Sequence, residues 1–244
     1  MGVLFIVGVL VYWNSLRVPF LFDDSQHIVE NRTIERLWPP GKLLTRGARP
    51  VVQISIAVNY ALGGRHVLGF HLVNIAIHII ASLLLYGIVR RTYEFASTSG
   101  GMTASNGRQQ PGEAVWLAFA VALIWLVHPL QTQTVTYTIQ RSESLMGLFY
   151  LLTLYCVIRS TEGHRTLWSI AAVAACAVGM GTKEVMVTAP FSVLLYDYVF
   201  LARSPYEAFR RRWGLYLGLA ATWGIVFGLV GEQLVTNQTS AGFG

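Results

Sequence analysis

Charge and cysteine are both scarce in this sequence. Only 12% of its 244 residues are Asp, Glu, Lys or Arg, whereas soluble domains carry about 25%. Apolar and aromatic residues make up 54% of the chain and fall in long blocks instead of alternating with polar residues. These charges are too few to cover a water-exposed surface. A soluble enzyme is therefore excluded, and an integral membrane protein is predicted.

Other absences narrow the chemistry. The two cysteines, Cys156 and Cys176, lie inside apolar stretches and provide no disulfide framework. The chain has no glycine-rich phosphate loop, zinc-binding pattern or nucleophile elbow, so phosphate or sugar chemistry must use scattered residues. The net charge of +6 reflects arginines at the ends of apolar blocks, where lipid headgroups attract them. Nucleic acid is therefore not an expected partner.

Seven apolar blocks are candidates for the roughly 20-residue helices that cross a membrane. They cover residues 1–16, 66–89, 114–127, 145–158, 167–181, 185–202 and 213–230. We predict an all-α integral membrane domain over 1–231, with about seven transmembrane helices and a long first extracytoplasmic loop at 17–65. Residues 92–113 are rich in Ser, Gly and Thr and predict a flexible cytoplasmic linker. Residues 232–244 would begin another extracytoplasmic loop, in which the chain is expected to be truncated.

If each block crosses the membrane once, the connecting segments alternate between two faces. The first set contains 17–65, 128–144, 182–184 and the tail after residue 231, and the second contains 90–113, 159–166 and 203–212. In the short loops of the first set only Arg141 and Lys183 are basic, whereas the second set carries nine basic residues. The positive-inside bias therefore places the second set, and with it the N-terminus, in the cytoplasm.

The first loop contains an adjacent acidic pair, Asp23 and Asp24. One carboxylate of such a pair can stay ionised as a general base or metal ligand, while repulsion raises the proton affinity of the other. The simpler interpretation is a helix cap, because Asp-Asp-Ser often begins a helix. The alternation of faces favours a catalytic or metal-binding role for the acidic pair over a helix cap, because it brings other ionisable side chains to the same face. These are His128, Arg141, Glu143, Lys183 and Glu184.

Structural interpretations compete for some of these side chains. Lys183 and Glu184 could simply form an ion pair that closes a tight hairpin between two spans. Arg141 and Glu143 could form a structural pair whose charged ends reach the membrane surface. A further polar stripe on the second apolar block contains His71, Asn74 and His78 at helical spacing. Metal ligation would need an i, i+4 pair and a third donor, so hydrogen bonding between helices is the favoured interpretation of the stripe.

Several short motifs occur in an order that resembles a known family. They are Phe22-Asp23-Asp24, Arg49-Pro50, Asn59-Tyr60-Ala61-Leu62-Gly63-Gly64, Gly69-Phe70-His71-Leu72-Val73-Asn74, His128-Pro129, Arg141-Ser142-Glu143, Lys183-Glu184 and Tyr196-Asp197. From about residue 14 to 202, their order and spacing are similar to the N-terminal membrane region of the TMTC O-mannosyltransferases and their bacterial relatives. These GT-C glycosyltransferases transfer sugar from a polyprenyl-phosphate carrier on the lumenal or periplasmic side.

The resemblance implies a role for each matched position. Asp23 or Asp24 would be the catalytic base that takes the proton of the acceptor hydroxyl, and Arg141 and Lys183 would bind the donor phosphate. Supporting roles would fall to Glu143, Glu184 and His128. Some GT-C enzymes use a divalent cation at the acidic motif and others do not, so Asp23 and Asp24 are the candidate ligands but no cofactor is assigned.

The resemblance also implies partners and a location. A polyprenyl-phosphate sugar, mannose in the named family, would be the donor and a protein hydroxyl the acceptor. The location would be the bacterial inner membrane or the endoplasmic reticulum membrane. Full-length members of the family have more spans and often a tetratricopeptide-repeat domain, neither of which this chain contains.

Two other functions fit a chain of this composition. A transporter or flippase would place ionisable residues near the middle of its spans, and a non-catalytic membrane scaffold would tolerate neutralisation of every charge. The expected gathering of ionisable residues at one face favours the glycosyltransferase over both.

Overall fold

The computed structural model describes residues 1–38, 49–98, 112–201, 205–229 and 231. Every regular element within these ranges is helical, which confirms the all-α prediction. The α-helices are α1 (Gly2–Tyr12), α3 (Pro50–Gly63), α4 (Val67–Thr98), α5 (Glu113–Val127), α6 (Gln131–Thr136), α7 (Arg141–Glu162), α8 (Arg165–Met180), α9 (Ala189–Tyr196) and α10 (Pro205–Ala221). Short 3-10 or π turns occupy Trp13–Arg17, Ser25–Val29, Arg32–Glu35, Thr138–Gln140, Glu184–Thr188 and Asp197–Leu201.

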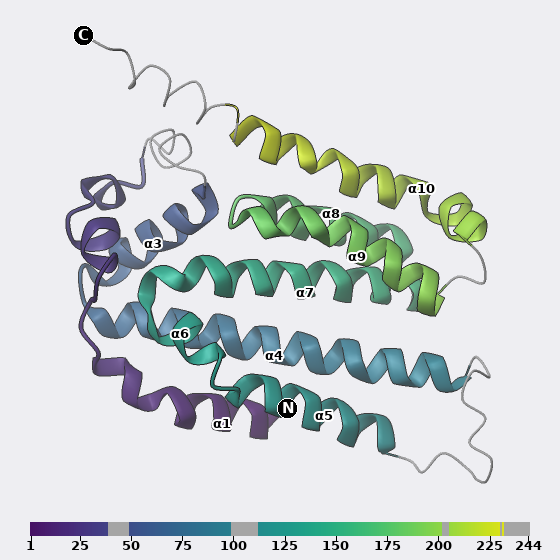
Figure 1. The fold of residues 1–244 in the computed structure, drawn as a ribbon, viewed down its shortest axis with the longest axis horizontal. Coiled ribbons are helices and arrows are strands. Elements are labelled where there is room, and N and C mark those ends of the chain that lie inside the picture. The colour runs from purple at the N-terminus through teal and green to yellow at the C-terminus, as the bar shows by residue number, and fades with distance from the viewer. Residues whose placement is uncertain (39–48, 99–111, 202–204, 230, 232–244) are drawn as a thin grey trace.

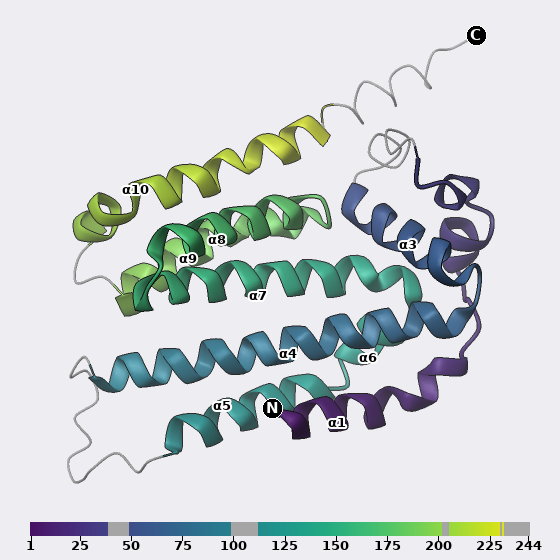
Figure 2. The same cartoon turned by 180° about the vertical axis from the view of Figure 1, so that it is seen from behind.

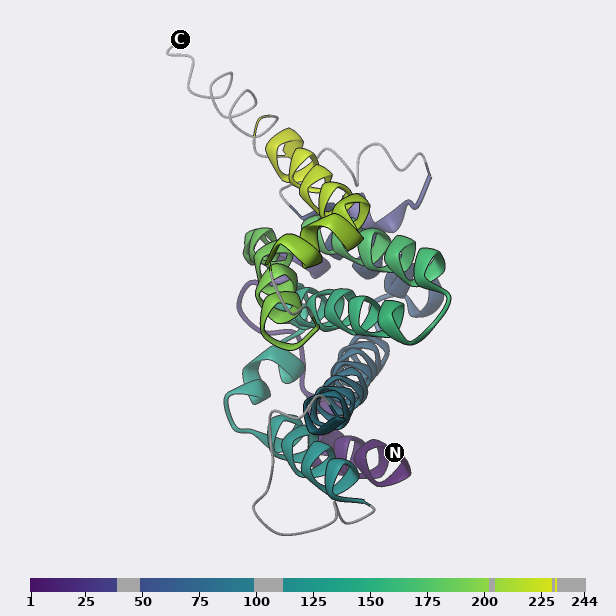
Figure 3. The same cartoon turned by 90° about the vertical axis from the view of Figure 1, so that its right-hand side faces the viewer.

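The long helices lie side by side in one elongated stack (Figures 1 and 2). Helix α4 contacts α1 and α5 on one side and α7 on the other, and α7 in turn contacts α8 and α9. Helix α10 covers α8 and α9 at the edge of the stack, as the end-on view in Figure 3 shows. The stack therefore brings together segments that lie more than a hundred residues apart in the chain.

Local sequence explains several helix boundaries. Pro50 occupies the first position of α3, where its missing N–H costs no hydrogen bond. Gly64 ends the same helix with φ +59°, a left-handed conformation that glycine adopts without steric cost. Helix α5 stops before His128, whose extended backbone (ψ 131°) is the conformation favoured by a residue that precedes proline.

Small residues allow close packing between helices. A Cβ atom on Gly8 of α1 would lie 2.6 Å from Cγ1 of Ile79 on α4, so only glycine permits this approach. Such close contacts are typical of membrane helices, which associate by packing more than by the hydrophobic effect. Cys156 and Cys176 are buried in the core shared by α7 to α10 and form no disulfide, as expected from their apolar surroundings in the sequence.

Three described helices are long and apolar enough to cross a membrane. They are Val67–Ser97, Thr138–Glu162 and Glu184–Leu201, and the last two include the short turns that precede or follow α7 and α9. Four shorter apolar helices accompany them: Gly2–Arg17, Pro50–Gly63, Glu113–Val127 and Arg165–Met180. The membrane character of the fold is therefore supported, whereas the count of seven spans stays a prediction.

Two expectations about the connections need correction. The segment 17–65 was expected to be a loop, but it contains the apolar helix α3. This helix is shorter than a membrane span, and polar residues interrupt its apolar sequence. Helix α4 continues to Thr98, past the predicted end of its apolar block and into the segment 92–113. The extension is polar but carries the i, i+4 ion pair Arg90–Glu94, which supports helix in water-exposed positions. Residues 99–111 and 232–244 lie outside the described residues.

Candidate functional site

Four segments of distant sequence meet at one end of the stack. Figures 1 and 2 show the turns after α1, helix α3, helix α6 with the start of α7, and the turn between α8 and α9 at the same end. These segments carry the predicted site residues except His128, which lies between α5 and α6. Which side of the membrane this end faces stays a prediction.

Asp24 is a buried structural acid. Its side chain is only 2% exposed. Oδ1 accepts a hydrogen bond from the backbone N–H of Ile139 at 2.8 Å, and Oδ2 accepts one from Leu21 at 3.2 Å. Burial raises the pKa of Asp24, and the backbone donors oppose this by stabilising the carboxylate. Asp24 does not cap the turn that follows it, so it ties the first connecting segment to the segment before α7.

Asp23 is exposed, although it is the direct neighbour of Asp24. Its backbone N–H donates to Oη of Tyr137 at 2.9 Å. The preceding residue, Phe22, has φ +46° and an 85% exposed side chain, with its ring set edge-on to Tyr137 at 6.4 Å between centroids. A non-glycine residue in this conformation costs about 1 kcal/mol or more and is found at functional sites. This turn therefore holds one carboxylate inside the protein and leaves the other outside.

A groove of about 800 Å³ lies beside Tyr137, between the end of α1 and helix α6. The rings of Phe22 and Tyr137 line it together with polar side chains that include Asn14, Thr132 and Gln133. No Asp, Glu, Lys or Arg is among the lining residues. Desolvation and the nearby carboxylates of Asp23 and Asp24 raise the pKa of the Tyr137 hydroxyl, which therefore stays protonated near neutral pH. The groove is neutral, with the exposed acid at its rim.

Arg141 begins α7 and is completely buried. Its Nε donates to Oδ1 of Asn74 at 2.7 Å, and its Nη2 donates to Oδ1 of Asn59 at 2.9 Å and to the carbonyl of Phe70 at 3.0 Å. Nη1 donates to the carbonyl of Ser55 at 3.2 Å. The guanidinium therefore joins α3, α4 and α7. Arg141 is not among the residues that line the groove, and its expected role as a ligand of the donor phosphate stays a prediction.

Lys183 and the supporting residues form other pairs than the sequence suggested. Lys183 pairs with Glu143 from the first turn of α7, and both side chains are only part-exposed. Glu184 pairs with Arg49 at 3.6 Å. The structure therefore does not show the Lys183–Glu184 and Arg141–Glu143 pairs that were the competing structural interpretations. His128 is exposed, and its Nδ1 accepts a hydrogen bond from the backbone of Leu130 at 3.2 Å.

The polar stripe of α4 bonds to neighbouring segments as expected. His71 Nε2 contacts the carbonyl of Val18 at 3.0 Å, and His78 Nε2 contacts that of Leu126 at the same distance. Asn74 donates to the carbonyl of Val135 at 3.3 Å. Within the described ranges, no three His, Cys, Asp or Glu side chains are grouped as a metal site. The hydrogen-bonding interpretation is confirmed.

The site also contains residues that the sequence analysis did not assign. Tyr137 and Phe22 define the turn at Asp23, and Asn59 and Ser55 hold Arg141. Asn59 and Phe22 belong to the quoted motifs, which is the only signal the sequence offered. Tyr137 is the only tyrosine of the hydroxyl-rich segment 128–144, but it belongs to none of the quoted motifs.

Residues 114–229 match the family described as dolichyl-phosphate-mannose-protein mannosyltransferase. The match covers α5 to α10, and therefore includes Tyr137, Arg141 and Lys183 but not the acidic pair. Together with the all-α membrane fold, it supports a glycosyltransferase of the GT-C type.

The curated proteins that the chain resembles are protein O-mannosyl-transferases of the TMTC type. The chain is 27% identical to mouse protein O-mannosyl-transferase TMTC4, over 81% of this chain and 29% of that protein. It is 28% identical to human TMTC2, over 80% of this chain and 23% of the relative. It is 26% identical to Xenopus laevis tmtc2, over 90% of this chain and 27% of that protein. The chain thus spans less than a third of each of these relatives. No solved structure matches it significantly.

Proposed function

We propose that this chain is the membrane region of an enzyme that moves a hexose, mannose in the named relatives, from a polyprenyl phosphate to a protein hydroxyl. The observation that carries the proposal is the exposed carboxylate of Asp23 at the rim of a neutral groove. The names of the relatives, protein O-mannosyl-transferases, supply the reaction class. The positive-inside bias supports a lumenal or periplasmic position for this end.

Asp23 is the proposed base. It takes the proton of the acceptor hydroxyl while the hydroxyl oxygen attacks the anomeric carbon of the sugar. The bond between that carbon and the phosphate oxygen breaks, and the phosphate leaves with the electron pair. A well-placed base contributes about 10²- to 10⁴-fold in rate. Asp23 suits this role better than Asp24, because both oxygens of Asp24 already accept backbone hydrogen bonds.

The groove suits a neutral, hydroxyl-rich group. The amides of Asn14 and Gln133 and the hydroxyl of Thr132 provide donors and acceptors for sugar hydroxyls. The rings of Phe22 and Tyr137 offer apolar faces to the C–H groups of a sugar ring. A phosphate would find no cation among the lining residues, so we place the sugar and the acceptor here and the phosphate outside the groove.

Lys183 is the proposed phosphate ligand. It is part-exposed, and its ammonium is paired with Glu143 in this structure. The turn between α8 and α9 that carries it lies at the same end of the stack as the turns after α1 (Figure 1). A bound phosphate would share this ammonium with Glu143, and a charge-assisted bond of this kind stabilises negative charge on a leaving group. Arg141 and Asp24 then act as positioning residues that fix the turn and the start of α7.

A divalent cation is not part of the proposal. Mg²⁺ and Ca²⁺ are bound by several oxygen ligands, and both oxygens of Asp24 face backbone N–H groups. Asp23 alone is a poor fit for such an ion. Among the described residues no group of three potential ligands surrounds the acidic pair.

The test is transfer of labelled mannose from polyprenyl-phosphate mannose to protein by membranes containing the full-length protein. Asp23→Asn should lower transfer by at least about 100-fold. The matched control is Glu30→Gln, which removes an exposed acid six or seven residues from the acidic pair and should leave transfer unchanged. Full transfer by Asp23→Asn would refute the assigned base, and donor-independent labelling would refute the reaction class.

A further inference from the structure

A second groove lies at the opposite end of the stack from Asp23, between α8 and α10. Its volume is about 600 Å³. Ile170 and Ala174 of α8 form one wall, and Trp213 and Leu215 of α10 form the other. Ile170 is 62% exposed and Trp213 is 59% exposed, so the walls present apolar side chains to their surroundings. The proposed sugar transfer does not use this groove.

The mouth of the groove is positively charged. Arg165, the first residue of α8, lines it and is exposed. Within the described part of the chain, no hydrogen bond or ion pair engages Arg165. Arg212 also lines the groove, but it pairs with the buried Asp197 of the segment after α9. One cation is thus committed inside the protein and the other is free for a ligand, with the hydroxyls of Thr166 and Ser169 beside it.

We infer that this groove binds an anionic phospholipid, with one acyl chain between α8 and α10 and the headgroup phosphate at Arg165. Charge complementarity selects this occupant. An apolar protein segment in the same place would bury the guanidinium of Arg165 without an anionic partner, and an unpaired charge is costly in a membrane. A zwitterionic lipid would bring its own positive charge next to Arg165. Trp213 suits the interfacial level at which aromatic rings of membrane proteins lie.

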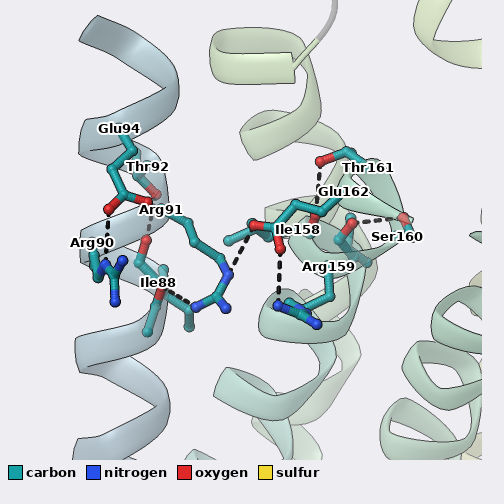
Figure 4. Close-up of polar contacts among 12 residues, drawn as sticks. Ile88, Arg90, Arg91, Thr92, Glu94, Ile158, Arg159, Ser160, Thr161 and Glu162 are labelled. Atoms are coloured by element: carbon teal, nitrogen blue, oxygen red, sulfur yellow. Dashed lines mark hydrogen bonds and ion pairs between the residues drawn. The ribbon is translucent and has the colours of Figure 1, made fainter. Parts of the chain in front are cut away.

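The other arginines at this end are engaged in a different way. Arg91 of α4 and Arg159 of α7 each form an ion pair with one carboxylate oxygen of Glu162, at 2.9 Å (Figure 4). Arg90 forms an ion pair with Glu94 at 2.8 Å. The guanidinium of Arg159 also lies 5.0 Å from the ring centre of Trp168. The positive charges of Arg90, Arg91 and Arg159 are thus neutralised by Glu94 and Glu162. Arg90 is therefore a matched control for Arg165, because it is exposed at the same end but does not line the groove.

The test is a lipid titration of the full-length protein in detergent, followed by native mass spectrometry, with phosphatidylglycerol or phosphatidylcholine of identical acyl chains. The wild-type protein should bind phosphatidylglycerol more tightly. Arg165→Gln should weaken that binding by about fivefold, the contribution of one interfacial cation, and Arg90→Gln should not change it. Ala174→Phe, which fills the groove from an exposed position, should weaken the binding of both lipids.

Four outcomes would overturn the inference. Equal binding of the two lipids would show that no headgroup is selected. Equal losses in Arg165→Gln and Arg90→Gln would show attraction to general surface charge instead of a site. Unchanged lipid binding in Ala174→Phe would show that the groove is not the place of binding, as expected if another segment of the full-length protein covers it. Displacement of the lipid by soluble glycerol phosphate would likewise contradict a site that needs the acyl chain.

Discussion

The buried network around Arg141 at one end of the helical stack differs from the surface network around Glu162 at the other end. At the end that carries the acidic pair, Arg141 and Asp24 are buried and bonded to neutral backbone and amide groups, and Asp23 is left exposed. At the other end, Arg91 and Arg159 share Glu162 at the surface. Buried charges are costly unless fully hydrogen-bonded, so the first end must be held rigidly. The surface pairs of the second end contribute little to stability.

The largest predicted effect is that of Arg141→Met. The substitution leaves the side chains of Asn59 and Asn74 and the carbonyls of Ser55 and Phe70 without their donor. Breaking a buried charged network of this kind costs about 3 to 5 kcal/mol. Denaturant unfolding in detergent measures the loss, and Arg141→Lys should not restore it, because an ammonium cannot reproduce the planar fork. A stable Arg141→Met protein would contradict the positioning role.

A smaller effect is predicted for Tyr137→Phe. The hydroxyl accepts the backbone N–H of Asp23, so its removal loosens the turn that presents the carboxylate. Loss of one hydrogen bond is worth about 1 kcal/mol, which corresponds to roughly a fivefold decrease in transfer. The rate of mannose transfer per folded molecule measures this effect. Unchanged transfer would show that Asp23 does not depend on Tyr137.

Asp24 provides a test by pH. Because burial raises the pKa of Asp24 in the folded state above the usual value of an aspartate, the folded protein binds this proton more tightly than the unfolded chain does. Protonated Asp24 therefore stabilises the fold at a pH below its pKa in the unfolded chain. This contribution is lost as the pH rises through its pKa in the folded protein. The unfolding free energy of the wild type minus that of Asp24→Asn should fall as the pH rises from about 4. A difference that grows with pH would contradict the buried acid.

The smallest effect is predicted at the second end. Glu162→Gln removes the acid shared by Arg91 and Arg159, all of which are part-exposed. Pairs of this kind contribute about 0.2 to 1 kcal/mol and are weakened by salt. Unfolding at low and high salt should show a loss below about 1 kcal/mol that shrinks as salt is added. A loss as large as that of Arg141→Met would remove the contrast between the two ends.

The sequence was sufficient for the features that depend on residue type and period. The apolar blocks, the buried cysteines and the hydrogen-bonding stripe of α4 follow from composition and helical spacing, and the structure agrees. The segments around Asp23, Arg141 and Lys183 were expected at one face, and they lie at one end of the stack (Figure 1). The resemblance to TMTC enzymes, stated from motif order, is supported by the comparisons.

Features that depend on individual contacts could not be predicted. The burial of Asp24 instead of Asp23 follows from the left-handed backbone of Phe22, for which the sequence gives no indication. The burial of Arg141 depends on Asn59, which α3 supplies from within a segment expected to be a loop. The partner of Lys183 is Glu143, forty residues away, and not its neighbour Glu184. Each of these outcomes is decided by packing between distant segments.

The central claim is that adjacent carboxylates have separate tasks, and the most direct measurement compares single-turnover mannose transfer by Asp23→Asn and Asp24→Asn in the full-length protein. Rates are divided by the amount of folded protein. We expect a loss of at least about 100-fold for Asp23→Asn and a loss of less than about tenfold for Asp24→Asn, whose defect should appear as lower stability. The reverse order, or equal losses in both variants, would contradict the central claim.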